Sequence, residues 1–366
     1  MATNQKIIYI GNARCYHTMD WYRSAESILS KDQLFFATDL INSEGHKVIV
    51  NKEDNLIHLV NIDQFLFNSQ NRAGDIWRNL VKLAMFYPQV RKIKKLAKSQ
   101  PNATYHAHTM YYMFLCWIAR IPFIGTPQGS EILVRPLKSR LYKYFCIKSL
   151  KAAKVVTVDS VAMRDGIARL ADVKAEIVQN GIDMQAILGN EHLSTRPKTR
   201  VLSIRGITPL YRINELVDAR NHSKQYPNLD FIYPFFDEQY KERIQPNLKE
   251  KDKDHGRVSR EMMYKLMAES KLVLSIPISD SSPRSVYESI FCGACVAISK
   301  NSYYNVLPNC MKERIIVVDL ADQDWFTKAL NQAENIVDKP YVPSEKALHM
   351  FDQKISMKFV IDNFYI

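Results

Sequence analysis

Several features that would place this protein outside the cytoplasm are missing from its sequence. Its 366 residues contain no uncharged apolar run of 18 residues, so we expect no membrane-spanning helix. The first residues lead directly into the apolar segment 7–10 without an apolar leader, so no secretory signal peptide is expected. The six cysteines lie mostly within apolar runs, which fits a reducing compartment. The sequence therefore predicts a cytoplasmic protein.

Signatures of several function classes are also missing. No glycine fingerprint followed by an acid about 20 residues later occurs, which argues against a dinucleotide oxidoreductase. Cys292 and Cys295 have no second cysteine pair and no histidine nearby, so we interpret them as packing of a tight turn rather than as a metal or redox site. No helix-turn-helix, zinc or RNA-binding signature is present, so nucleic acid is not an expected partner.

Acidic residues are scarce in the first half of the chain. The net charge is +12, and residues 1–190 alone hold 25 Lys and Arg against 15 Asp and Glu. No acid occurs between Glu131 and Asp159, and none occurs in the basic segment Lys82–Lys98. Between the two acids, basic residues alternate at helical spacing with apolar ones, namely Leu137, Leu141, Tyr144, Phe145 and Leu150. This pattern predicts a basic amphipathic helix.

A basic amphipathic helix commonly lies on an anionic membrane surface, where each basic residue contributes about 1 kcal/mol. The alternative is a solvated basic face without a partner. We expect membrane docking through the basic N-terminal half of the chain.

Alternation of strand-like and helix-like segments predicts two doubly wound α/β domains. The boundaries are expected at 1–185, 186–345 and 346–366, the last segment being a C-terminal helix, and the stretch 184–200 is the expected linker. The first domain is predicted to contain a helix over 21–34 and a strand over 47–50, among others. In the second domain we expect strands at 200–204, 230–233, 272–276, 295–298 and 315–318.

The segment from Asp280 to Glu288 is the most informative in the chain. A buried strand precedes it, and a short helix that ends near Gly293 follows it. The free N–H groups at the start of such a helix suit a phosphate. The two carboxylates could accept hydrogen bonds from hydroxyls on either side of that phosphate, as a nucleotide sugar would require. A capped surface helix is the alternative.

The same segment resembles the donor-site motif of glycosyltransferase family 4, Glu-x7-Glu-Ala-x-x-x-Gly. Asp280 replaces the first Glu, and Ser281-Ser282-Pro283 replaces the usual Gly-Phe-Gly. Arg205, after a predicted strand, is similar to the family's diphosphate-binding Arg, and Leu210 occupies the position of its Lys. Tyr211 and Arg212 follow, so either could be the second diphosphate ligand. The resemblance further implies donor contacts from Ser282, Arg284, Ser285 and Glu288.

The N-terminal half resembles the acceptor side of the same family. The first loop is rich in polar groups, and the segment Thr126–Glu131 is similar to the family's His-Gly-x-Asp, with Gln128 and Glu131 in place of His and Asp. His106 and His108 are similar to its His-Ala-His, although packing histidines are the more frequent alternative. The residues predicted to bind the acceptor are Asn12, Arg14, His17, Asp20, Gln128, Glu131 and Asn180. Asp20 could equally be a helix cap.

The resemblance covers nearly the whole chain and implies a GT-B fold, two facing Rossmann-like domains with a cleft between them, the terminal helix returning to the first domain. It implies a retaining, metal-independent glycosyltransferase without a cofactor. The enzyme would move a hexose from a nucleoside-diphosphate sugar to a lipid-linked glycan at the inner face of the membrane. Arg205, Asp280 and Glu288 are its catalytic candidates. The alternatives are another GT-B enzyme, such as an epimerase or phosphorolytic transferase, and a non-catalytic glycan-binding relative.

Overall fold

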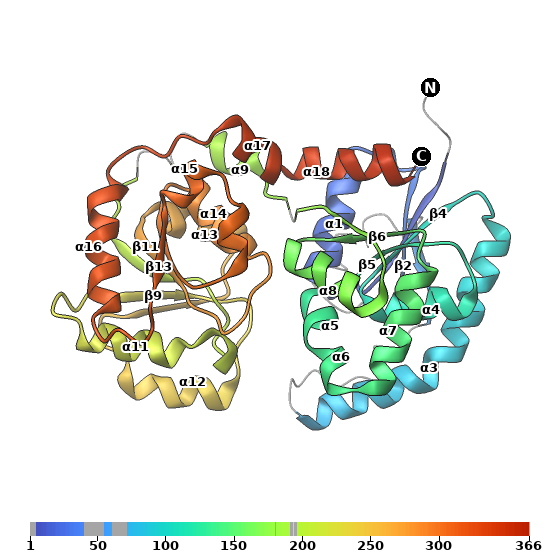
Figure 1. Cartoon of the computed structure of the whole chain (residues 1–366), viewed down its shortest axis with the longest axis horizontal. Helices are drawn as coiled ribbons and strands as arrows, with labels where there is room; N and C mark the ends of the chain where they lie inside the picture. Colours follow the sequence, from blue (N-terminus) through green and yellow to red (C-terminus); the bar gives the residue numbers. More distant parts are fainter. Residues whose placement is uncertain are drawn as a thin grey trace. The chain divides into compact units, whose positions relative to one another are not determined.

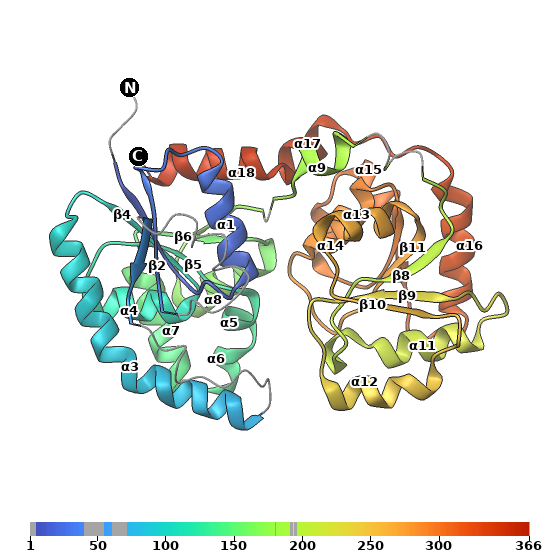
Figure 2. The same ribbon diagram turned by 180° about the vertical axis from the view of Figure 1, so that it is seen from behind.

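The computed structural model describes residues 5–39, 55–60, 72–179, 181–190, 193 and 196–365. The chain divides into two compact units. Unit 1 comprises Met1–Gln179 and Lys354–Ile366, and unit 2 comprises Asn180–Gln353, whereas the sequence prediction places the boundaries after residues 185 and 345. Each unit is an α/β domain with its own sheet (Figures 1 and 2).

Unit 1 is built on a parallel sheet with the strand order β3-β2-β1-β4-β5-β6-β7. Its strands are β1 (Ile7–Ile10), β2 (Leu34–Thr38), β3 (Leu56–His58), β4 (Thr104–His108), β5 (Ile124–Thr126), β6 (Val155–Val158) and β7 (Ala175–Ile177). Its helices are α1 (Tyr16–Glu26), α3 (Arg72–Ser99), α4 (Met110–Ala119), α5 (Gly129–Leu133), α6 (Arg135–Lys138), α7 (Arg140–Ala152), α8 (Val161–Ala171) and, near the C-terminus, α18 (Gln353–Val360).

Unit 2 contains a second parallel sheet, with the order β10-β9-β8-β11-β12-β13. Its strands are β8 (Arg200–Ser203), β9 (Leu229–Ile232), β10 (Lys253–Gly256), β11 (Ser270–Ser275), β12 (Cys295–Ser299) and β13 (Ile315–Val318). Its helices include α9 (Met184–Leu188), α11 (Ile213–His222), α12 (Glu238–Ile244), α13 (Arg260–Ala268), α14 (Arg284–Phe291), α15 (Asn309–Lys312), α16 (Trp325–Val337) and α17 (Glu345–Phe351), with 3-10 turns at Pro209–Tyr211, Gln245–Asn247 and Ser302–Val306.

The central strands are continuous apolar runs because both of their faces are covered. Every residue of β1 and of β12 is buried, as expected for parallel strands that lie between two helical layers. In each sheet the strand order reverses once, between β1 and β4 and between β8 and β11. Ligands of doubly wound sheets bind outside the carboxyl ends of the strands at this point, so a ligand of unit 2 is expected at the loops after β8 and β11.

The structure corrects two predicted segments. The helix predicted over 21–34 is confirmed only as far as Glu26, because α1 spans Tyr16–Glu26 and the apolar run from Leu34 forms strand β2. The prediction of a single basic helix is wrong. Ser139 has an extended backbone, and its hydroxyl caps a new helix by accepting from the N–H of Tyr142 at 3.2 Å, which separates α6 from α7. The strand predicted over 47–50 lies outside the described residues.

The end of the chain packs in unit 1. Met357, Val360 and Tyr365 join the core formed by β1, α1 and β2. The hydroxyl of Tyr365 lies 2.6 Å from Nδ1 of His106 on β4. Among the described residues, no helix combines the length and the apolar composition needed to cross a membrane.

Candidate functional site

Arg205 lies in the loop that follows β8, at the point where the strand order of unit 2 reverses. Through its two terminal nitrogens it donates to the carboxylate of Asp280 and, at 3.1 Å, to Oγ of Ser285. Its guanidinium carbon lies 4.7 Å from the ring centroid of Tyr211. The structure thus brings together four residues that the sequence analysis assigned to one donor site.

Asp280 follows β11, the strand paired with β8. One carboxylate oxygen accepts from the N–H of Ser281 at 2.9 Å, while the other faces Arg205. Both side chains are largely buried, and a buried charge requires a partner because it has lost its hydration. The ion pair satisfies this requirement, yet Nε of Arg205 has no hydrogen-bond partner among the described residues. The guanidinium therefore retains a donor for a further acceptor.

Helix α14 begins at Arg284, directly after Pro283. The first N–H groups of a helix lack intrahelical acceptors and carry a partial positive charge. Ser285, on the first turn, already contacts Arg205, so the helix start and the arginine point at one place. This combination of a cation and free N–H groups is suited to a diphosphate.

Glu288 lies one turn further along α14 and is only 4% exposed. Its Oε1 accepts from the hydroxyl of Tyr264 at 3.0 Å and lies 3.2 Å from Nε of Arg284. Burial, and next the Glu288 carboxylate, raise the pKa of Tyr264. The phenol therefore stays protonated and continues to donate to Glu288, which holds this carboxylate in one orientation.

The two candidates for the second diphosphate ligand diverge in the structure. Tyr211 lies beside Arg205, whereas Nε of Arg212 lies 3.6 Å from the carboxylate of Glu215. Arg212 also has a left-handed backbone, with φ of 53°, at the start of α11. Of the pair, Tyr211 is the one in contact with Arg205. Ser282 is buried, and its Oγ lies 3.5 Å from the hydroxyl of Tyr287.

Sequence reasoning missed two residues at this site. Tyr264 on α13 carries the hydrogen bond to Glu288. Tyr303, in the 3-10 turn after β12, packs edge-on against Tyr287 with 6.1 Å between the ring centroids. The position of Tyr303 just after a strand end is a signal that could have been used, because such positions line the ligand edge of a parallel sheet. No local pattern indicates Tyr264.

The acceptor candidates of unit 1 gather around the first loop. Side-chain Nε2 of Gln128 donates to Sγ of Cys15 at 2.9 Å, which connects the loop after β5 with the loop after β1. A Cβ added to Gly11 would lie 2.5 Å from the Thr18 side chain, so a larger residue would force that buried side chain to shift. Oδ1 of Asn12 accepts from the N–H of Arg14 at 2.8 Å and shapes this loop.

The other acceptor candidates have different surroundings. Glu131 is buried, and its Oε2 accepts from the N–H groups of Gln128 and Met110, both at 2.9 Å, so this carboxylate supports the loop locally. Burial raises its pKa. His17 is exposed on α1, and Asp20 lies 3.8 Å from Arg23 within that helix. The reading of Asp20 as a helix cap is wrong, because α1 begins at Tyr16. Asn180 lies outside the described residues.

The two histidines of β4 differ in how many of their ring nitrogens have a hydrogen-bond partner. Both ring nitrogens of His106 have hydrogen-bond partners, the hydroxyls of Tyr365 and Thr126, and burial lowers its pKa to about 3. His106 is thus a neutral packing residue. Nδ1 of His108 lies 3.1 Å from Oγ1 of Thr18, whereas its Nε2 has no partner among the described residues.

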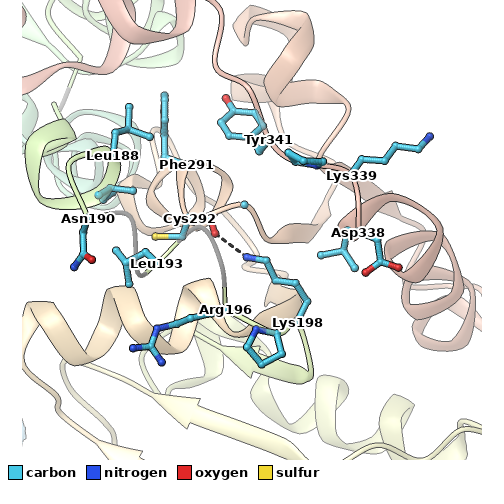
Figure 3. Close-up of a pocket in the computed structure, with 15 residues that line it drawn as sticks. Leu188, Asn190, Leu193, Arg196, Lys198, Phe291, Cys292, Asp338, Lys339 and Tyr341 are labelled. Carbon is cyan, nitrogen blue, oxygen red and sulfur yellow. Dashed lines mark hydrogen bonds between the residues drawn. The ribbon is translucent and has the colours of Figure 1, made fainter.

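Unit 2 also contains a cavity of about 330 Å³ away from these residues. Figure 3 shows the amine of Lys198 directed at the main-chain carbonyl of Cys292, and the same amine donates to the carbonyl of Ala268. The two carbonyls end α14 and α13, where a cation is favourable. Burial nevertheless lowers the pKa of Lys198 to about 8. The cavity is lined by none of the predicted site residues, and Lys198 joins two helix ends.

Comparisons with known proteins agree with this geometry. Residues 6–160 match the family model described as glycosyl transferase 4-like. No curated protein matches the sequence. Among solved structures, HepE from Anabaena in complex with UDP and glucose is 14% identical with a TM-score of 0.72, and the match covers 98% of both chains. Sucrose-phosphate synthase from Thermosynechococcus elongatus is 11% identical with a TM-score of 0.70, again covering 98% of both chains. The lipopolysaccharide outer core galactosyltransferase WaaB is 12% identical with a TM-score of 0.64, covering 98% of this chain and 99% of WaaB.

At these identities the structural matches establish the fold, which is the GT-B fold of glycosyltransferases. The match of residues 6–160 covers less than half of the chain, and it confirms the predicted resemblance to glycosyltransferase family 4.

Proposed function

We propose that this protein is a retaining glycosyltransferase that moves a hexose from a nucleoside-diphosphate sugar to a hydroxyl of a lipid-linked glycan. The observation that carries the proposal is the position of Arg205. It lies at the reversal point of the unit 2 sheet, between Asp280 and the start of α14. HepE was crystallised with UDP-glucose, and WaaB acts on lipopolysaccharide outer core, which supports a role in cell-surface polysaccharide synthesis.

In this proposal the donor's diphosphate accepts hydrogen bonds from Arg205, the Ser285 hydroxyl and the first N–H groups of α14. The same groups stabilise the negative charge that grows on the diphosphate as the glycosidic bond breaks. Glu288 accepts from the ribose hydroxyls, and Asp280 accepts from hydroxyls of the transferred sugar. Because these groups supply the positive charge, we propose that no divalent metal is required.

The acceptor is proposed to bind unit 1 through the first loop and Gln128. Asn12, Arg14 and His17 would contact acceptor hydroxyls, together with Asp20, Glu131 and Asn180. A glutamine cannot remove a proton at neutral pH, so Gln128 would orient the acceptor by hydrogen bonds. By resemblance to the family, the acceptor hydroxyl attacks from the face that the diphosphate leaves, which retains the configuration of the sugar.

We also propose that unit 1 docks on the cytoplasmic face of an anionic membrane. Along α6 and α7, Leu137 is 86% exposed and Leu141 is 69% exposed, and the neighbouring Lys138, Arg140 and Lys143 are exposed as well. Phe145 and Leu150 turn inward instead. Helix α3 adds exposed Leu80, Leu83 and Tyr87, and both Figures 1 and 2 draw α3 and α6 at the same end of unit 1.

Such a surface combines basic side chains for lipid headgroups with apolar side chains that can enter the interface. Neutralising Lys138, Arg140 and Lys143 together should remove about 3 kcal/mol of binding, because each basic residue near the lipid contributes about 1 kcal/mol. This corresponds to a roughly 100-fold weaker association with vesicles that contain phosphatidylserine. The matched control neutralises Lys224, Lys251 and Lys253, which are exposed in unit 2. Equal losses in the two variants, or no loss in the first, would refute docking through α6 and α7.

A thermal-shift screen tests the enzyme proposal. The purified protein is heated with UDP, GDP, CMP, ADP and their sugars, with and without EDTA. A ligand at about 100 times its Kd stabilises the fold by roughly 2.7 kcal/mol. We expect a shift with one nucleoside diphosphate and its sugar that EDTA does not alter. The absence of a shift with every nucleotide would overturn the donor-site assignment, and the glycan-binding alternative would then lead.

A further inference from the structure

Tyr303 is a buried residue beside the candidate donor site that the proposed chemistry does not use. It lies in the 3-10 turn Ser302–Val306, and only 4% of its surface is exposed. Its hydroxyl has no hydrogen-bond partner among the described residues. A phenol hydroxyl that is buried without a partner is unfavourable, because it has lost its hydrogen bonds to water. Its retention in this position therefore needs an explanation.

The surroundings of Tyr303 connect its turn to the candidate donor site. Its turn follows β12, which pairs with β11, the strand that leads to Asp280. The hydroxyl of Ser299, at the end of β12, donates to the carbonyl of Pro277 at 2.9 Å. This bond joins the loop that carries Tyr303 to the loop that carries Asp280. The Tyr303 ring also packs edge-on against Tyr287, which neighbours Glu288 on α14.

Electrostatics support the same placement. Burial is the main reason that the pKa of Tyr303 is raised, and the Asp280 carboxylate raises it further, while Arg205 opposes the change. Both Asp280 and Arg205 therefore act electrostatically on the phenol, which stays protonated and can donate a hydrogen bond.

We propose that the Tyr303 hydroxyl hydrogen-bonds a hydroxyl group of the donor's transferred sugar, next to Asp280, and thereby contributes to the choice of sugar. This inference rests on the proposed function. The sugar is the matching part of the donor for two reasons. A neutral phenol that can both donate and accept suits a sugar hydroxyl, and the diphosphate already has Arg205, Ser285 and the start of α14. A site that hydrogen-bonds a substrate hydroxyl rejects analogues that lack it, because the site's polar group is then left without a partner.

The replacement Tyr303→Phe tests this proposal, because it removes the hydroxyl and keeps the ring against Tyr287. Three pairs of ligands are tested by calorimetry on the wild-type protein, each ligand in a separate titration: UDP and UDP-glucose, GDP and GDP-mannose, and ADP and ADP-glucose. The pair that the wild-type protein binds is then measured with the variant. We expect the variant to bind the nucleotide sugar about tenfold more weakly, the magnitude of one hydrogen bond. Affinity for the nucleoside diphosphate alone should stay unchanged, since it lacks the sugar. Tyr304→Phe is the matched control, and it should alter neither affinity.

A second readout separates a ligand contact from a structural role. Because the hydroxyl has no partner in the described fold, its removal should leave the melting temperature of the ligand-free protein the same or higher. A lower melting temperature, or an equal loss of affinity for diphosphate and nucleotide sugar, would show that the hydroxyl supports the fold and would overturn the proposal. An unchanged nucleotide-sugar affinity in the variant would overturn it too, and would leave the proposed function intact. If the wild-type protein binds none of these ligands, the Tyr303 proposal and the proposed function are both overturned.

Discussion

The replacement Arg205→Lys is the most direct perturbation of the candidate donor site. Arg205 uses two nitrogens for Asp280 and Ser285, and its guanidinium also stacks over the ring of Tyr211. A lysine keeps the charge but lacks the planar fork. It therefore cannot contact the carboxylate, the hydroxyl and a phosphate in one fixed arrangement, and it also loses the stacking that orients the group.

The expected magnitude follows from the hydrogen bonds that the fork can make. A charge-assisted hydrogen bond contributes about 1.5–3 kcal/mol, and the lysine variant should lose one such bond to the diphosphate. This loss corresponds to a Kd that rises roughly 10-fold to 150-fold. Because Asp280 keeps a cation nearby, we expect the free energy of unfolding to change much less than the binding energy.

Isothermal titration calorimetry with the nucleoside diphosphate that the protein binds measures this change. The matched control is Arg212→Lys, because Arg212 lies in the same loop but faces Glu215. Its Kd should stay within about twofold of the wild-type value, since Arg212 pairs with Glu215 and not with Asp280, and a partly exposed ion pair contributes little. The reasoning is refuted if Arg205→Lys binds as tightly as the wild-type protein, or if both variants lose the same affinity.

Two further predictions concern stability. Arg220 is fully buried and donates to both carboxylate oxygens of Asp252, at 2.7 and 2.6 Å. The replacement Arg220→Ala should lower the free energy of unfolding in urea by about 3–5 kcal/mol, because it leaves a buried carboxylate without its partner. As a control, Arg243→Ala at an exposed position should change this free energy by less than about 0.5 kcal/mol. Burial lowers the folded-state pKa of His106 to about 3, so below pH 6.5 the unfolded chain binds a proton that the folded protein does not, and stability is lost as the pH falls from 6.5 toward 3. Between pH 7 and pH 5 the free energy of unfolding of the wild-type protein should therefore fall by about 2 kcal/mol more than that of His106→Gln. Equal losses for the two proteins in urea unfolding would contradict this prediction.

The strands of both units were readable from the sequence where they lie in the middle of a sheet. The predicted strands 272–276 and 295–298 correspond to β11 and β12, because strands covered on both faces are short continuous apolar runs. Strand β10, Lys253–Gly256, was missed. It is a polar edge strand that exists through its pairing with β9, so its own residues carry no signal. Strand β2 was missed as well, and its first residue, Leu34, was assigned to the end of a helix, since a short apolar run does not distinguish a strand from a helix.

Some residues of the candidate site were also identifiable from the sequence, whereas the contacts between them were not. Arg205 and Asp280 were identifiable because each follows a predicted strand and carries chemistry that suits a phosphate or a sugar. Their direct pairing was not foreseen, since 75 residues separate them in the chain. The sequence also left Tyr211 and Arg212 as equal candidates. The left-handed backbone at Arg212 turns that side chain toward Glu215, and only the folded loop contains this information.

The sequence by itself therefore determined the alternation of strands and helices, the basic first half and the residues that follow the strand ends. These properties are local, since burial on both faces, helical periodicity and charge are written in neighbouring residues. Only the tertiary structure decided that Tyr264 holds Glu288, that the buried Glu131 carboxylate accepts from the N–H of Met110, and that the buried Tyr303 hydroxyl has no partner among the described residues. Such contacts join segments that are distant in the chain, and they depend on how the loops at one edge of a parallel sheet pack together.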